Sequence, residues 1–329
     1  DHVDAVEPPR NQSAPVVPKR AHRRAFIDTL EDFRTSDPAL SMPMVLLWQF
    51  IALMSVFATV ALCGNLAYWT GRHTYDFAHE SWVLAIPVAW ITYCIGYTVM
   101  AVIVKWTVVG RLKPGRYVPY GKTHLRWWTA NLFLNFGRQS VWLAFRDSHL
   151  GVWILQLLGG RVHHGATLNI DGLNPAVSLI DADLLTIEDR AYIRRGALVQ
   201  CHMFVEGSFV LAPVRLGARS VVWTRAVVEP GAEVDVAGIV EHHSVLTAGH
   251  YVPPQTRVRG VPAQAVGTHS EDGVKPGFHG TETWVHTLMG LIALPYMAVA
   301  GGYLFIQIIS LFVTDPSIHH FDWRLWVAL

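Results

Sequence analysis

Acid–base chemistry in this chain falls most naturally to four histidines of its second half, which are His202, His242, His243 and His250. An imidazole titrates near neutral pH, so it can take the proton from an amine or hydroxyl that attacks a carbonyl. His242 and His243 are adjacent and follow Glu241, a carboxylate that could orient one of the two rings. We therefore expect His243, or its neighbour His242, to be the general base, with His202 and His250 as the other candidates.

These histidines lie in a repeat of six residues. An aliphatic side chain recurs at every sixth position, and a small residue often follows four positions later. A half-buried strand alternates with period two and a helix repeats at about 3.6 residues, so neither explains the pattern. The repeat predicts a parallel β-helix, in which the aliphatic guide residue fills the inside of a coil and the small residue lets the chain turn. The predicted guides are Ile187, Ile193, Val199, Val205, Leu211, Leu216, Val222, Val228, Val234, Val240, Leu246 and Val252.

The repeat also predicts where the candidate histidines lie. His202 and His243 occupy the third position after a guide, at a corner of the coil where a side chain can face outward. His250 stands where a small residue normally turns the corner.

Outside the repeat, the sequence is typical of a membrane protein. Of the 329 residues, 51% are hydrophobic and 16% are charged, and 13 are Trp, which is apolar and aromatic relative to a soluble domain. The apolar runs Met44–Leu62, Trp82–Val104 and Thr287–Val313 are long enough to cross a hydrocarbon core of roughly 30 Å. Another apolar run begins near Phe321, so we expect the parent protein to continue beyond Leu329. The predicted organisation is an N-terminal arm at 1–40, two transmembrane helices at 41–110, an interfacial amphipathic linker at 111–161, a β-helix at 162–268, a linker at 269–285, a third transmembrane helix at 286–314 and the start of a fourth at 315–329.

Charged residues and cysteines set the orientation and limit the classes of site. Basic residues cluster before the first span and after the second, and the loop between them holds only Arg72. By the positive-inside rule, the N-terminus and the β-helix share the cytosol-like side of an unidentified membrane. The three cysteines are far apart in the sequence, so neither a disulfide framework nor a Cys-based zinc site is indicated.

The linker at 111–161 contains a Trp- and Arg-rich helix. Leu125, Trp128, Phe133 and Trp142 can share one side of it, and Arg138 lies elsewhere. Such stretches usually lie in the headgroup layer of a bilayer. Because the stretch directly follows a membrane span, we expect a lipid partner and no nucleic acid.

Several motifs along the chain resemble those of a known family. They are Lys105-Trp106, Gly110–Tyr117, Leu125–Trp128, Leu157–Val162 and Asp183–Asp189. Together they resemble the membrane C-terminal region of nonribosomal peptide synthetases of the poly-ε-lysine synthetase type, in which membrane helices alternate with hexapeptide-repeat modules. The resemblance implies amide-bond formation between activated amino acids. This chain departs from that pattern because it has a single β-helix module and no adenylation or carrier domain, and because Val118–Gly121 replaces an aromatic-rich turn.

The repeat itself resembles hexapeptide acyltransferases, whose coils are left-handed and contain three hexads each. The exit, Ala248–Pro254 followed by Gly260–Ala263, is similar to the close of such domains. The resemblance implies a left-handed parallel β-helix of about four coils, flanked by transmembrane helices. It also implies a histidine base acting on a thioester, here a phosphopantetheine thioester on a carrier domain.

Two alternatives remain open. One is a non-catalytic structural subunit of a large membrane complex, respiratory or photosynthetic. The other is a zinc protein similar to gamma-class carbonic anhydrases, which share the β-helix and bind zinc through three histidines. In that family two ligands lie two coils apart at one corner. Two coils before His243 lies Gly207 or Ser208, and two coils after His202 lies Ala237 or Gly238. We therefore expect no metal.

Overall fold

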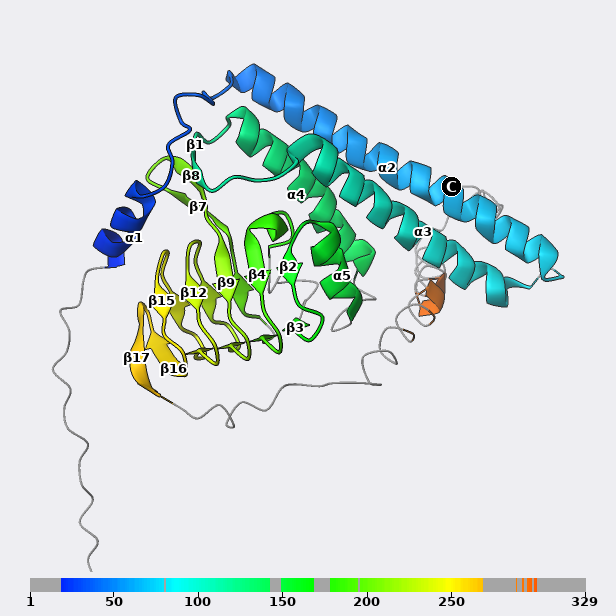
Figure 1. Cartoon of the computed structure of the whole chain (residues 1–329). Helices are drawn as coiled ribbons and strands as arrows, with labels where there is room; N and C mark the ends of the chain where they lie inside the picture. Colours follow the sequence, from blue (N-terminus) through cyan, green and yellow to red (C-terminus); the bar gives the residue numbers. More distant parts are fainter. Residues whose placement is uncertain are drawn as a thin grey trace, which may run out of the picture.

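The computed structural model of the chain describes residues 19–79, 81–142, 149–168, 178–194 and 196–268, with a few positions between 288 and 300. Within this part, two long helices run side by side along one edge of a stack of short strands (Figure 1). The predicted linker at 269–285, the predicted span at 315–329 and almost all of 286–314 lie outside the described residues.

The two long helices are the spans predicted within residues 41–110. α2 comprises Met42–Phe77 and α3 comprises Trp82–Val104. Both are long and apolar enough to cross a membrane. They approach closely at Gly71, where a Cβ would lie 2.9 Å from the Cβ of Ala89, and small residues at such crossings are typical of membrane helices. The chain leaves α3 through a π-helical turn, η1 (Lys105–Val109). The side of the membrane on which the strands lie stays a prediction.

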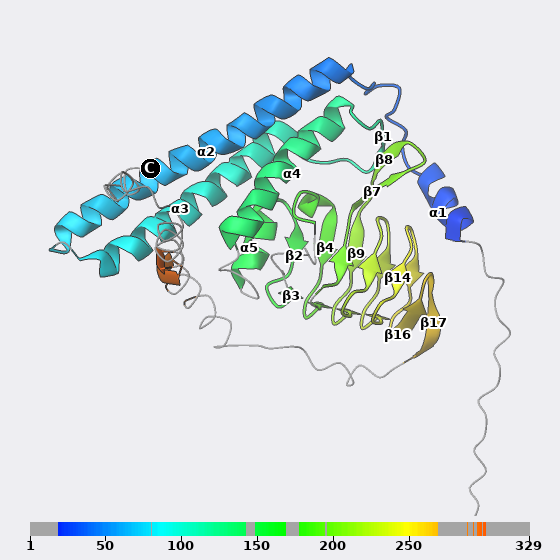
Figure 2. The same ribbon diagram turned by 180° about the vertical axis from the view of Figure 1, so that it is seen from behind.

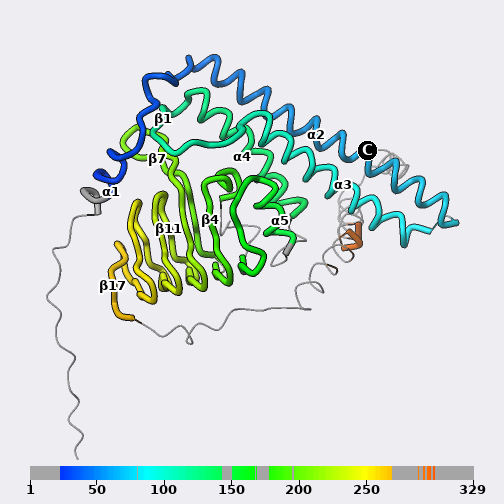
Figure 3. Tube along the Cα trace, in the orientation of Figure 1, coloured from blue at the N-terminus to red at the C-terminus, as the bar shows by residue number. Residues whose placement is uncertain are grey.

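The strands form three parallel sheets wound into a β-helix (Figure 3). Guides stack on guides in register, since Ile187 pairs with Leu216, and Val234 pairs with both Leu216 and Val252. These four side chains are at most 1% exposed. The first sheet contains β2 (Arg161–Val162), β4 (Leu185–Ile187), β9 (Val214–Leu216), β12 (Glu233–Val234) and β15 (Tyr251–Val252). The second contains β3 (Thr167–Leu168), β5 (Tyr192–Ile193), β10 (Val221–Val222), β13 (Ile239–Val240), β16 (Thr256–Gly260) and the antiparallel β17 (Ala263–Thr268). The third contains β6 (Leu198–Val199), β11 (Val227–Val228) and β14 (Val245–Leu246).

The predicted parallel β-helix is therefore confirmed, and its left hand stays a prediction. Within the described residues, the first sheet holds five stacked strands, one more than the four coils expected. The additional strand is β2, which precedes the recognised repeat.

The corners of the coils explain the third position of each hexad. Residues there have a left-handed backbone, with φ near +55° at Arg190, Ala237 and His243 and +77° at Gly231. Glycine adopts this conformation without a Cβ penalty, and other residues adopt it at a cost. At these corners Arg190 and His243 are exposed, whereas Ala237 is buried.

Two predicted guides are wrong. Val205 and Leu211 belong to an antiparallel hairpin, β7 (His202–Val205) and β8 (Ser208–Leu211), which leaves the coil after Val199. β8 is also paired with β1 (Gly115–Tyr117), a strand from the segment that follows the membrane helices. Aliphatic residues of the hairpin happen to keep the six-residue spacing, so the insertion was invisible in the sequence. His202 consequently lies at the base of this hairpin and not at an outward-facing corner.

α4 (Lys122–Ser140) lies between the long helices and the strands (Figure 2). Leu125 and Phe133, on its predicted apolar side, are buried, and so are Trp127 and Leu134 elsewhere on the helix. Burial on more than one side is typical of a helix within a protein core. An interfacial position of residues 111–161 stays a prediction. The following helix, α5 (His149–Leu157), contacts β2.

The described part of the N-terminal arm is held to the β-helix. In α1 (Lys19–Asp28), Arg23 forms an ion pair with Glu229. The ring of Phe26 covers Gly231 and Gly249, where any Cβ would clash with it. The arm therefore makes specific contacts with the outer coils over the residues that the structure describes.

The same arm also caps α4. The carboxylate of Asp37 accepts hydrogen bonds from the backbone N–H groups of Lys122 and Thr123, both at 2.9 Å. A carboxylate at this position satisfies free N–H groups and complements the helix dipole. Asp37 thereby fixes the start of the helix that carries part of the candidate site.

Candidate functional site

The carboxylate of Asp181 is 0% exposed and contacts three polar side chains. Its Oδ2 lies 2.5 Å from Nδ1 of His202 and accepts a 2.8 Å hydrogen bond from the hydroxyl of Ser178. Its Oδ1 accepts a 2.6 Å bond from the indole Nε1 of Trp127. Three polar side chains thus contact this one carboxylate. Asp181 and His202 therefore form a dyad with a fixed geometry.

The two residues of the dyad and their neighbour Trp127 come from three elements that are far apart in the sequence. Asp181 precedes the 3₁₀ turn η3 (Ala182–Leu184), at the entry to the coil that begins with β4. His202 opens the hairpin inserted after that coil, and Trp127 projects from α4. The rings of Trp127 and His202 meet edge to face at 4.7 Å. Because the hairpin lies under α4, His202 is 17% exposed and not at the surface.

His202 also faces a cavity of about 170 Å³ between α4 and the coil. Since Nδ1 contacts Asp181, Nε2 is the nitrogen left for a ligand, and the described residues offer it no hydrogen bond. A ring whose Nδ1–H is held by a carboxylate presents a free lone pair on Nε2. The cavity is lined by Asn131, Leu134, Asn135, Arg138, Ser178, Leu179, Leu198, Gln200 and His202.

A second histidine lies beside the dyad. His124 of α4 is buried, and its Nδ1 accepts a 2.9 Å hydrogen bond from the backbone N–H of Tyr120. Burial, and secondarily the nearby His202, lower the pKa of His124. Its ring packs against Phe204 and Phe209 of the hairpin, at centroid distances of 5.3 and 5.1 Å. His124 is therefore a neutral part of the wall that shields the dyad.

The other predicted histidines lie elsewhere on the β-helix. His242 and His243 are exposed, and the ring of His242 packs on Trp223 at 4.7 Å. Glu241, expected to orient one of them, instead pairs with Arg257 and Arg259. That expectation was wrong because the coil stacks Glu241 beside two arginines one turn later. The structure does not bring His242, His243 or His250 together with His202.

Metal binding finds no support in the described residues. Nowhere in the described ranges do three His, Cys, Asp or Glu side chains gather as a metal site requires. Another close histidine–acid pair is at the surface, where His163 Nδ1 lies 3.0 Å from Asp189. Two ligands alone do not make a zinc site.

A buried ion pair joins this site to the end of α3, the second of the two long apolar helices. Nζ of Lys105 lies 3.3 Å from Oδ2 of Asp183, and the two side chains are 0% and 7% exposed. Oδ2 also accepts a 2.6 Å bond from the backbone N–H of Leu112. Burial raises the pKa of Asp183, opposed by the Leu112 amide and Lys105. Because Asp183 is two residues from Asp181, this pair fixes the segment that carries the dyad.

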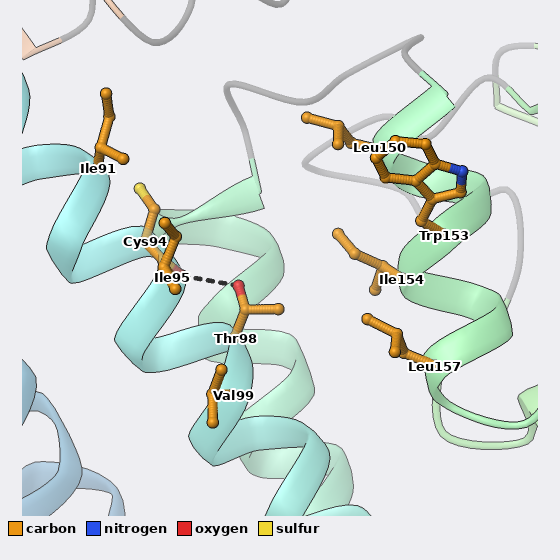
Figure 4. A pocket seen from close by; sticks show the side chains of 9 residues that line it. All are labelled: Ile91, Cys94, Ile95, Thr98, Val99, Leu150, Trp153, Ile154 and Leu157. Atoms are coloured by element: carbon orange, nitrogen blue, oxygen red, sulfur yellow. Dashed lines mark hydrogen bonds between the residues drawn. The ribbon is translucent and has the colours of Figure 1, made fainter.

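A larger cavity, of about 300 Å³, separates α3 from α5 (Figure 4). Ile91, Ile95 and Val99 face Trp153 and Leu157 across it. The hydroxyl of Thr98, which also lines the cavity, already donates a hydrogen bond to the carbonyl of Cys94 in the same helix. Its lining also includes the thiol of Cys94 but no histidine or carboxylate, so we place the chemistry at His202.

Sequence reasoning included His202 among the candidates and missed Asp181, Trp127 and the cavity. One signal was available: Asp181 and Asp183 interrupt the apolar run Leu179–Leu185. Acids in an apolar run must be paired when the run is buried, and such pairs mark candidate sites.

Comparison with known proteins gives a partial relative and remote structural likenesses. No family model matches the chain. The delta-poly-L-ornithine synthetase of Acinetobacter baumannii (strain AB307-0294) is 28% identical over 181 residues, which cover 54% of this chain and 13% of that synthetase. The chain therefore corresponds to a small part of that relative's length.

Among solved structures, similar chains are acetyltransferases. A galactoside acetyltransferase in complex with coenzyme A is 12% identical, covers 50% of this chain and 92% of its own, and has a TM-score of 0.36. A hexapeptide-repeat acetyltransferase from Vibrio cholerae is 13% identical, with 42% and 88% coverage and a TM-score of 0.31. A serine acetyltransferase from Neisseria gonorrhoeae in complex with serine is 15% identical, with 67% and 96% coverage and a TM-score of 0.23. The fold assignment above rests on strand pairing and not on these low scores.

Proposed function

We propose that this chain is a membrane-bound acyl or aminoacyl transferase module that forms amide bonds, with His202 as its general base and Asp181 as the group that orients it. The observation that carries the proposal is the 2.5 Å contact between His202 Nδ1 and a fully buried carboxylate, at the edge of a polar cavity. The hexapeptide-repeat β-helix and the partial identity to a poly-L-ornithine synthetase support the same reaction class. The finer assignment, to the poly-ε-lysine synthetase type, rests on the motifs around Lys105 and Trp127.

The proposed reaction transfers an acyl group from a thioester to an amine. Asp181 holds the Nδ1 proton, so the lone pair of His202 lies on Nε2. As the amine nitrogen attacks the thioester carbonyl carbon, Nε2 takes the amine proton, the C–N bond forms and the C–S bond breaks. The imidazolium then gives this proton to the leaving thiolate. The products are an amide and a thiol, and His202 is neutral again.

We propose that the thioester is a phosphopantetheine arm on a carrier domain, because the relative named above is a synthetase. The membrane partner follows from α2 and α3, whose length and composition suit a bilayer. By the charge distribution, the β-helix faces the cytosol-like side.

The test is amide formation by the purified full chain in detergent, using the N-acetylcysteamine thioester of L-ornithine as donor and L-ornithine as acceptor. The informative variant is His202→Asn, whose side-chain amide can still donate to Asp181 and so preserves the fold. General-base loss typically costs about 10²–10⁴-fold in rate. The matched control is His243→Ala, an exposed histidine at a coil corner, for which we expect no comparable loss.

Mass spectrometry of the dipeptide product gives the outcome directly. Product formed by the wild type and lost in His202→Asn supports the proposal. If the folded wild type forms no product above the uncatalysed rate, a non-catalytic structural subunit becomes the better account. If His243→Ala loses activity and His202→Asn keeps it, the base has been misassigned.

A further inference from the structure

Arg138 lines the same cavity as His202 and is partly buried there. The guanidinium Nε of Arg138 is buried and has no hydrogen-bond partner. No carboxylate within the described residues forms an ion pair with it, and burial lowers its pKa. The carboxylate of Asp181, which contacts the cavity residues His202 and Ser178, is already engaged by both of them and by Trp127. An Nε–H without a partner at the cavity wall is a donor available to a bound anion.

The neighbours of Arg138 offer further donors and no competing charge. Asn131 and Asn135 precede it on the same side of α4, at the spacing of successive helical turns, and all three line the cavity. Gln200 lines the opposite wall, on the coil. Within the described part of the chain, none of these three amide side chains forms a hydrogen bond. Planar guanidinium and amide donors that converge in one small space suit a planar oxyanion.

We propose that Arg138, with Asn131 and Asn135, forms an oxyanion subsite that holds the carboxylate of an amino-acid acceptor while its amine faces His202. This rests on the proposed function for the identity of the acceptor. The cavity, at about 170 Å³, is smaller than the roughly 300–1,000 Å³ of sites for drug-sized ligands. It therefore suits a single amino acid better than a long chain. The same oxyanion chemistry could serve the phosphate of a phosphopantetheine arm, and the experiment separates the two sources.

The experiment compares the binding of two acceptors that differ at the carboxyl group, which is a charged carboxylate in one and a neutral methyl ester in the other. L-Ornithine and L-ornithine methyl ester are titrated calorimetrically into the full chain in detergent. Charge-assisted hydrogen bonds to a carboxylate imply that the wild type prefers the free acid by about 10- to 100-fold. Arg138→Gln should remove this preference. Arg126→Gln, an exposed arginine on the same helix, should keep it.

Two further arms make the result decisive. His202→Asn should bind ornithine with the wild-type preference although it transfers nothing, so failure of the base assignment and failure of the subsite are distinguishable. Phosphopantetheine is titrated into the wild type and into Arg138→Gln. If phosphopantetheine and not ornithine loses affinity in Arg138→Gln, the subsite binds the arm and the carboxylate assignment is overturned. If the wild type binds acid and ester equally, the subsite itself is overturned, whether or not Arg138→Gln folds.

Discussion

Removal of Lys105 should destabilise the protein because it leaves Asp183 as an unpaired buried charge. In the wild type, the carboxylate has Lys105 at 3.3 Å and one backbone N–H, and its Oδ1 has no hydrogen bond. Lys105→Met keeps the length of the side chain and deletes the charge. Asp183→Asn keeps an acceptor for the Leu112 N–H and leaves the Lys105 ammonium with the carbonyl of Gly110, at 2.8 Å, and the ring of Trp106, at 4.0 Å.

The size of the effect follows from burial. Breaking a buried ion pair by removing one partner costs about 3–5 kcal/mol, whereas replacing both partners by uncharged groups is often nearly neutral. Each single variant should therefore lower the free energy of unfolding by about 3–5 kcal/mol. The double variant Lys105→Met/Asp183→Asn should lose less than either single one. For a domain larger than 150 residues this corresponds to a fall of roughly 5–15 °C in melting temperature.

The assay is thermal unfolding in detergent, followed by tryptophan fluorescence, with all four combinations arranged as a double-mutant cycle. The control is Arg72→Met, which breaks an ion pair that is 53% exposed on both sides and should shift the melting temperature much less. If the losses of the two single variants simply add in the double variant, Lys105 and Asp183 are not coupled. The interpretation of the pair as the joint between membrane helix and β-helix would then be refuted.

Three other perturbations test the protonation state, the core and the topology. Burial and the nearby His202 lower the pKa of His124 below its ordinary 6.5. The contribution of neutral His124 to stability is therefore fully present above about pH 6.5 and is lost as the pH falls through the folded-state pKa. In melting temperatures measured across that pH window, His124→Asn should flatten this loss. Val228 is 0% exposed, and its burial is worth about 1.5–3 kcal/mol before the penalty for an unpaired carboxylate. Limited proteolysis should therefore show that Val228→Asp unfolds the β-helix, whereas Arg225→Asp, at an exposed corner, does little. Equal tolerance of the two substitutions would mean that the hexad register is wrong. The three native cysteines are buried, so a membrane-impermeant thiol reagent should label Arg225→Cys from the cytosol-like side and Asp76→Cys from the opposite one; labelling of both from one side would contradict two spans.

The coils could be predicted from the sequence because their stabilisation is local and periodic. Each guide from Leu216 to Val252 fills the same interior position, so burial selects an aliphatic residue every sixth place. The apolar parts of the two long helices were equally visible because their composition suits lipid, but α2 continues to Phe77, past the predicted end at Leu62, through a turn that contains Arg72 and Asp76. The hairpin was not visible, because Val205 and Leu211 kept the spacing by coincidence while pairing with a distant strand, β1.

The candidate site could be predicted only in part, because it depends on contacts between distant segments. His202 was a candidate on account of its residue type, yet its partner lies 21 residues earlier and its indole neighbour lies on a separate helix. Spacing within the repeat favoured His243, since Glu241 is close in sequence. In three dimensions Glu241 forms ion pairs with Arg257 and Arg259 of the next coil. Stacking of coils, and not sequence distance, decides which carboxylate meets which histidine.

The central claim, that His202 and Asp181 act as one catalytic unit, is tested most directly by single-turnover transfer in a double-mutant cycle. The cycle compares wild type, His202→Asn, Asp181→Asn and the double variant, each at saturating thioester. Residues that act together lose rate non-additively. We expect each single variant to slow transfer by about 10²–10⁴-fold and the double variant to be no slower than the slower single one. Wild-type rates in either single variant, or losses that multiply in the double variant, would contradict the dyad.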